Sequence, residues 1–231
     1  MFDDGTLNHS NVTTLLIATR NNHKIGEIRS ILGEAFRYLT LENLPTAPEV
    51  VEDANSFAGN AAKKATDLAL WLASENLMSA AHDEYFVLAD DSGLEVDALG
   101  GAPGVHSARF AALDSGTLGN SKDADNNAKL LRLLKDAPAE KRTARFRCVI
   151  ALVSANPQSA TANPQIFAGA CEGRINFAPR GAGGFGYDPL FIPDGFKESF
   201  AELGEDVKNR LSHRAAALEK LKDYFRNNPS A

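Results

Sequence analysis

Short apolar runs alternate with polar, helix-forming segments along the chain, and this order is typical of an α/β protein. Residues 14–19 form the first apolar run and predict a buried strand. A helical pattern follows, with Ile25, Ile28 and Leu32 on one face and Gly33 at its end. The pattern therefore predicts a strand, a short polar turn and a helix.

Later segments repeat this alternation and indicate one large sheet with helices around it. Residues 143–153 alternate apolar and polar side chains, which predicts a half-buried strand, and residues 165–175 are expected to return as its hairpin partner. The other expected elements are strands at 36–41, 87–89 and 190–193, and helices at 56 to about 77, about 126–135 and 212–225.

The run Val87-Leu88-Ala89 leads directly into two adjacent carboxylates, Asp90 and Asp91. Ligands of α/β proteins gather beyond the carboxyl ends of strands. Two acids at such a place are costly to desolvate unless a cation or a proton neutralises them, and Mg²⁺, which takes oxygen ligands, would do so. The alternative is a polar Asp-Asp-Ser-Gly turn that ends the strand and faces water.

The first strand runs into a polar turn and then the N-terminus of a helix, a geometry that aims backbone N–H groups at an anion. Thr19 and Asn21 could add hydrogen bonds there, and Lys24 a point charge for a phosphate. An Asn-capped helix with an exposed lysine would give the same pattern.

The long helix from Ser56 carries Asn60 and Lys64 one turn apart on one face, and Glu52 comes just before it. A carboxylate and an amine could therefore line one cleft. Any surface helix also shows such residues.

Residues 181–189 contain the Gly-x-Gly-x-x-Gly string of dinucleotide-binding folds, but no strand runs into it and Tyr187-Asp188-Pro189 cannot open the required helix. The interpretation that we favour is a glycine-flanked aromatic. Flexible backbone around Phe185 would let its ring lie flat against a planar ligand.

Composition and charge narrow the choice of partners. The 44% hydrophobic content is that of an ordinary globular protein, and the net charge of −6 argues against a nucleic-acid polymer or a membrane surface. A small phosphorylated ligand needs only a local basic pocket. Residues 1–13, expected to be a flexible leader, lack secretory features, and Cys148 and Cys171 give no disulfide framework, so we expect a cytoplasmic protein.

Six strings occur in one order between residue 15 and about residue 225. They are Ala18-Thr19-x-Asn21-x-x-Lys24-x-x-Glu27, Glu52-x-x-x-Ser56-Phe57-x-x-Asn60-Ala61-x-x-Lys64-Ala65, Ala89-Asp90-Asp91-Ser92-Gly93-Leu94, Gly101-Ala102-Pro103-Gly104-Val105-x-Ser107-Ala108-Arg109, Gly183-Gly184-Phe185-Gly186-Tyr187-Asp188-Pro189 and Lys208-x-x-x-Ser212-His213-Arg214. With these strings the chain closely resembles the inosine triphosphate pyrophosphatase family, in particular its RdgB-like branch of dITP/XTP pyrophosphatases.

The resemblance implies an α/β fold in which a long mixed twisted sheet and flanking helices form two lobes around a central cleft. Residues 14–231 would form this single domain, and two chains a homodimer. The implied reaction hydrolyses ITP, dITP or XTP to the nucleoside monophosphate and pyrophosphate. Water would attack between the α- and β-phosphates, with Mg²⁺ as cofactor.

The resemblance also implies roles for individual residues. Glu52 and Asp91 would bind the metal, and Asp91 would orient and deprotonate the attacking water. Asp90 would support the site or bind a second metal. His213 and Arg214 would donate to a 6-oxo group and Asp188 would accept from a ring N–H. The full expected substrate-binding set is Thr19, Arg20, Asn21, Asn22, His23, Lys24, Lys64, Ser92, Phe185, Gly186, Tyr187, Asp188, Lys208, His213 and Arg214.

Two other interpretations compete with this one. A nucleotide-binding sensor that no longer hydrolyses its ligand predicts a missing metal ligand or base, yet Glu52, Asp90 and Asp91 are all present. A pyrophosphatase acting on other nucleotides, as in the Maf-like proteins, is disfavoured by the Ser212-His213-Arg214 string.

Overall fold

The computed structural model describes residues 13–75, 84–116, 119–156 and 163–228, and its centre is a six-stranded sheet in the order β2-β1-β3-β4-β5-β6. The three strands β2, β1 and β3 are parallel, and β3 to β6 are antiparallel. The expected mixed sheet is therefore confirmed, whereas the leader lies almost wholly outside the described residues. The strands are Thr14–Ile17 (β1), Arg37–Thr40 (β2), Tyr85–Val96 (β3), Thr143–Ser154 (β4), Gln165–Ile175 (β5) and Phe191–Pro193 (β6).

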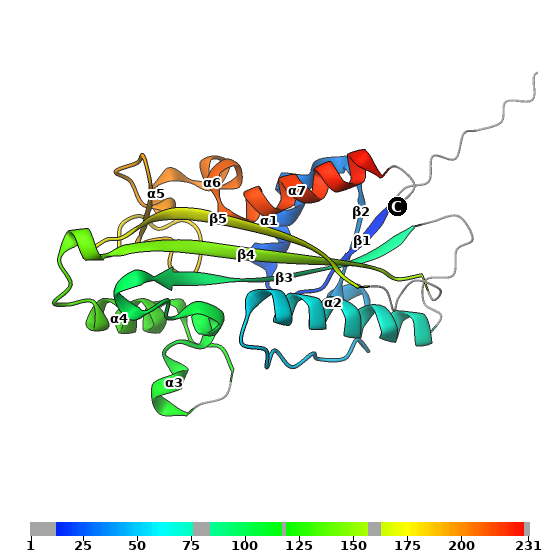
Figure 1. Ribbon diagram of the computed structural model, residues 1–231, viewed down its shortest axis with the longest axis horizontal. Helices are drawn as coiled ribbons and strands as arrows, with labels where there is room; N and C mark the ends of the chain where they lie inside the picture. The colour runs from blue at the N-terminus through cyan, green and yellow to red at the C-terminus, as the bar shows by residue number, and fades with distance from the viewer. Residues whose placement is uncertain (1–12, 76–83, 117–118, 157–162, 229–231) are drawn as a thin grey trace, which may run out of the picture.

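Helices cover both faces of this sheet, as Figure 1 shows. On one face α1 and α7 bury apolar side chains against β1, β3 and β4, and on the other face α2 does the same. A third cluster joins α4 and α5 to the far ends of β3, β4 and β5. The α-helices are Asn22–Leu32 (α1), Phe57–Ser74 (α2), Ala112–Ser115 (α3), Asp123–Leu133 (α4), Phe200–Leu203 (α5), Glu205–Leu211 (α6) and His213–Asn227 (α7), and Gly104–Arg109 is a 3₁₀ helix (η4).

Polar caps fix where three of these helices begin. The side chain of Asn21 accepts a hydrogen bond from the amide of Lys24, Ser56 caps α2 through Gly59, and Ser212 caps α7. Each capping residue belongs to one of the motif strings. Local sequence therefore fixes the backbone from which the motif side chains project.

The central strand differs from its expected form. The sequence predicts that an apolar strand ends at the two aspartates, but β3 continues through Asp90, Asp91 and Gly93 to Val96. It does so because β4 pairs with it along this whole length. The strand that ends here is β1, the parallel neighbour of β3, whose last residue pairs with Leu88. The carboxylates thus lie beside the end of β1, in the middle of β3, and no polar turn forms there.

The long helix α2 ends at Ser74, earlier than the expected end near residue 77, which lies outside the described residues. None of the helices in the described ranges is long and apolar enough to cross a membrane.

Candidate active site

Two adjacent aspartates lie on opposite faces of the sheet, because side chains alternate along a strand. Asp90 shares its face with Leu88 and contacts Cys148, on the side that α1 and α7 cover. Asp91 faces α2 and accepts a hydrogen bond of 3.0 Å from the side-chain amide of Asn60. A single strand therefore supplies one carboxylate to each side.

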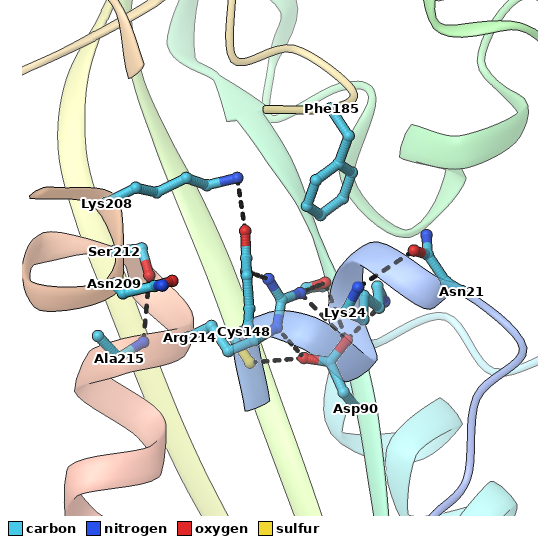
Figure 2. A network of polar contacts seen from close by, with 12 residues as sticks. Asn21, Lys24, Asp90, Cys148, Phe185, Lys208, Asn209, Ser212, Arg214 and Ala215 are labelled. Carbon is cyan, nitrogen blue, oxygen red and sulfur yellow. Dashed lines mark hydrogen bonds and ion pairs between the residues drawn. The ribbon is translucent and has the colours of Figure 1, made fainter. Parts of the chain in front are cut away.

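Asp90 is the most heavily paired carboxylate in the site. Its Oδ1 lies 2.5 Å from the Lys24 ammonium and accepts from the Ser92 hydroxyl at 3.0 Å. Its Oδ2 accepts from Arg214 Nε and from the Cys148 thiol, each at 3.0 Å (Figure 2). Burial alone would raise the pKa of Asp90, but the charges of Arg214 and Lys24 outweigh it and hold that pKa well below its usual range. Asp90 is therefore a fixed anion.

Asp91 has a different environment. Burial raises the pKa of its carboxyl, and the nearby carboxylate of Glu52 acts in the same direction. Against the charge of Lys24 and the hydrogen bond from Asn60, the resulting pKa is about 6. The Lys64 ammonium lies 2.5 Å from Glu52 and donates to the carbonyl of Asp90 at 3.2 Å. Glu52, Asn60 and Lys64 thus come together beside Asp91, whereas the cleft that Glu52 and Lys64 were expected to line stays a prediction.

The chemistry of this donor set fits a hard cation. The carboxylates of Glu52 and Asp91 repel each other, and the pKa of Asp91 is raised. A cation between them would remove this repulsion. Mg²⁺ is commonly held by one or two carboxylates together with waters and substrate phosphates. Within the described ranges no cluster of three or more His, Cys, Asp or Glu side chains offers a complete protein cage. Glu52 and Asp91 therefore suit a metal that shares its shell with a phosphorylated ligand.

An ion-pair chain connects this region to the glycine-rich loop, residues 181–189. Lys208 is almost fully buried, and its ammonium lies 2.5 Å from Asp188 and 2.7 Å from Glu27. Glu27 also pairs with Arg214. The chain alternates in charge along its length and runs Asp188, Lys208, Glu27, Arg214, Asp90, Lys24.

Glu27 was not among the expected site residues. Only its place in the first motif string, three residues after Lys24, pointed to it. Burial would raise the pKa of Glu27, but the charges of Arg214 and Lys208 lower it below its usual value. Glu27 therefore serves as the anion between two buried cations.

The glycine-rich loop carries its aromatic ring between two glycines with positive φ, Gly184 at 72° and Gly186 at 63°. The Phe185 amide donates to the Asp188 carboxylate at 2.9 Å. The ring stacks on the imidazole of His23 with centroids 5.1 Å apart, and the Lys208 ammonium lies 4.3 Å from its centroid. The ring expected to meet a planar ligand thus already contacts an imidazole and a cation.

Other expected residues lie at different depths. His213 is buried and stacks on Phe146, and burial together with the charge of Arg214 lowers its pKa well below the usual value. Tyr187 is also buried and donates to the carbonyl of Ser107 at 2.9 Å, so it anchors the loop from beneath. Arg20 and Asn22 are exposed at the start of α1.

A cleft of about 260 Å³ lies where these parts meet, between one face of α1, the tip of the glycine-rich loop and the start of α6. Its walls include His23, Glu27, Phe185 and Lys208. Pockets for drug-sized ligands measure about 300–1,000 Å³. This cleft is therefore of a size that suits one planar ring system.

Comparison with known proteins gives a consistent answer. The model of the Ham1 family matches residues 15–224. A dITP/XTP pyrophosphatase of Desulforamulus reducens is 47% identical over 208 residues, covering 89% of this chain and 92% of the relative. A dITP/XTP pyrophosphatase of Geobacter sulfurreducens is 46% identical over 215 residues, covering 93% and 97%.

Solved structures agree on the fold. A HAM1 protein from Coxiella burnetii is similar with a TM-score of 0.75 and 34% identity, over 94% of this chain and 100% of that one. A nucleoside-triphosphatase/dITP/XTP pyrophosphatase from Mycobacterium abscessus is similar with a TM-score of 0.64 and 38% identity, over 90% and 98%. The resemblance read from the motif strings is thereby confirmed.

Proposed function

The chain belongs to the Ham1 family, and we propose that it hydrolyses deaminated purine nucleoside triphosphates (dITP, XTP and ITP) to the monophosphate and pyrophosphate. The names of its relatives support the reaction. The observation that carries it in this chain is the meeting of Glu52, Asp91 and Lys64, on which the charge of Lys24 in the first turn of α1 also acts. Carboxylates and cations in that arrangement suit a metal-bound polyphosphate.

The triphosphate would lie against the first turn of α1. Helix N-termini present unpaired N–H groups and a positive dipole end to anions. Thr19 and Asn21 form the turn that precedes this helix, since Thr19 Oγ1 accepts from the amide of Asn21 at 3.2 Å. Lys24 and Lys64 add positive charge, and Arg20 and Asn22 complete the phosphate-binding segment, whereas His23 in the same turn lies against Phe185.

Asp91 is the proposed base. A general base works best when its pKa lies near the operating pH, and burial raises the pKa of the Asp91 carboxyl toward that range, to about 6 in the protein without a metal. Its carboxylate would orient a water and accept its proton as the water attacks the phosphorus, and Asn60 would hold the carboxylate in position. Mg²⁺, held by Glu52 and Asp91, would supply charge neutralisation at the phosphate oxygens.

The purine base would occupy the cleft beside Phe185. Gly186 and Tyr187 hold the loop, since the Gly186 amide donates to Asp123 at 2.6 Å. Lys208, His213 and Asp188 would recognise the polar edge of a 6-oxopurine, and Ser92 a phosphate or ribose oxygen. The Arg214 guanidinium is already bonded to Asp90, Glu27 and Ser92, so its direct contact with the base stays a prediction.

One assay tests the proposal. Pyrophosphate release from ITP, XTP and dITP is measured with and without Mg²⁺, beside ATP and GTP. We expect metal-dependent release of pyrophosphate with the first three substrates preferred, because buried donors placed for a 6-oxo group oppose a 6-amino group. Preference for ATP, or release of single phosphate, would contradict the proposal.

The oligomeric state is a separate proposal. We propose a homodimer, as the family resemblance implies, and a cytoplasmic location. Light scattering after size-exclusion chromatography distinguishes a dimer from a single chain of 24.7 kDa.

A further inference from the structure

Two flat rings lie together in the wall of the cleft. The imidazole of His23 and the ring of Phe185 both line it, with centroids 5.1 Å apart and planes inclined by only 11°. The rings come from different parts of the fold, since His23 lies in the first turn of α1 and Phe185 in the glycine-rich loop. They therefore stack on each other in the cleft that the proposed base must enter.

The backbone on each side is fixed by separate contacts. Asn21 caps α1 through the Lys24 amide, and the Lys24 side chain is held by Asp90. The Gly186 carbonyl accepts from Asn127 on α4 at 3.0 Å. The two rings thus belong to two walls that are anchored by different contacts.

The His23 imidazole and the Lys208 ammonium both contact the Phe185 ring, and of these two groups the imidazole is the one that can move aside. Lys208 is 3% exposed and is tied to both Glu27 and Asp188. His23 is exposed at the surface, so rotation about its side-chain bonds breaks no ion pair in the described part of the chain. A planar ligand would accordingly reach the Phe185 ring on the side of His23.

We propose that His23 is the second stacking surface of the base subsite, so that the purine inserts between its imidazole and the Phe185 ring. This inference rests on the proposed function and names a residue that positions the substrate. Carbon atoms in contact lie about 3.5–4.0 Å apart, so a base between two rings needs a separation of roughly 7 Å. Rotation of His23, or movement at the positive-φ glycines beside Phe185, would open the stack to that separation.

The test compares His23→Ala with His23→Phe, which keeps a flat ring. Binding of inosine monophosphate and of inorganic pyrophosphate is measured by calorimetry with Mg²⁺ present. Stacking on an aromatic side chain contributes strongly to base binding. His23→Ala should therefore weaken the binding of inosine monophosphate by about fivefold or more, and His23→Phe should weaken it by less than about twofold. Pyrophosphate, which has no base, should bind both variants as it binds the unchanged protein.

Steady-state kinetics provide a second readout. His23→Ala should raise KM for ITP while kcat stays within about twofold, because stacking is the same in the ground state and the transition state. Unchanged or tighter binding of the monophosphate to His23→Ala would overturn the inference, since the imidazole would then contribute nothing or merely cover Phe185. Equal loss of pyrophosphate binding would also overturn it, by assigning His23 to the phosphates. If the unchanged protein releases no pyrophosphate from ITP or XTP, the proposed function itself is wrong.

Discussion

At the scale of single residues, the sheet gives two neighbouring aspartates different chemistry. Asp90 is a permanently charged anchor for Arg214 and Lys24, whereas the pKa of Asp91 is raised to about 6. A group whose pKa lies far below neutrality is a poor base, and a group titrating near 6 is a good one. The two aspartates are therefore not interchangeable, although they are adjacent in the sequence.

This difference predicts opposite results for two matched variants. Asp91→Asn should lower kcat for ITP by about 10²-fold or more while the protein unfolds near its normal temperature, because the amide cannot accept the proton of water. Asp90→Asn should lower the free energy of unfolding by about 3–5 kcal/mol, because it leaves buried cations without their anion. Turnover assays and denaturant titrations measure the two effects. Near-normal turnover of Asp91→Asn would remove that residue from its role.

His213 predicts a pH dependence of stability. Its folded pKa lies well below 6.5 because of burial and the charge of Arg214, so below pH 6.5 the unfolded chain binds a proton that the folded chain does not. Stability is thus lost as the pH falls. Between pH 6.5 and 5.5 this loss should be about 1 kcal/mol, and His213→Gln should lack it. Equal slopes for both proteins, from urea unfolding at each pH, would refute the assignment.

At the scale of elements, local patterns predicted some strands accurately and missed the extent of another. The alternation at 143–153 and the run at 165–175 match β4 and β5 closely. Both strands could be predicted because the pattern of apolar and polar residues within each segment indicates a strand. The end of β3 could not be predicted in this way. Ser92 and Gly93 have the composition of a turn, and only pairing with a distant β4 keeps them extended.

Position 93 of β3 requires glycine because another element packs closely against it. A Cβ at this position would lie 2.4 Å from the Ser107 hydroxyl and 2.5 Å from the backbone carbonyl of Gly104, both in η4. Gly93→Ala should therefore destabilise the protein by about 1–3 kcal/mol, because η4 must shift.

Gly26 is the matched control for that substitution. It lies within α1, and a methyl group added there would meet no atom of the neighbouring elements within 4 Å, so Gly26→Ala should stabilise the protein by about 0.5–1 kcal/mol. Urea titration of both variants measures the difference. Destabilisation of the two variants by the same amount would show that strand packing is not the cause at Gly93.

At the scale of the whole molecule, the ion-pair chain defined above joins parts that the sequence keeps far apart. Motif strings identified Lys24, Asp90, Lys208 and Arg214 as site residues, but gave no sign that they pair with one another. That pairing depends on how α1, α6 and α7 pack, which a single sequence does not reveal. Glu27 was missed for the same reason, since its partners lie almost at the other end of the chain.

The central position of Glu27 gives a prediction for the whole fold. The ion-pair chain contains three anions and three cations. Glu27→Gln removes one anion and leaves one buried positive charge uncompensated at Lys208 and Arg214. The free energy of unfolding at pH 7 should fall by about 3 kcal/mol or more.

Because the folded pKa of Glu27 is lowered, its stabilisation is complete above pH 4.5 and is lost as the pH falls through the folded value. The two proteins should therefore converge in stability in acid, whereas Glu42→Gln, an exposed control, should change little at any pH. A difference that stays constant with pH would mean that Glu27 acts through packing and not through its charge.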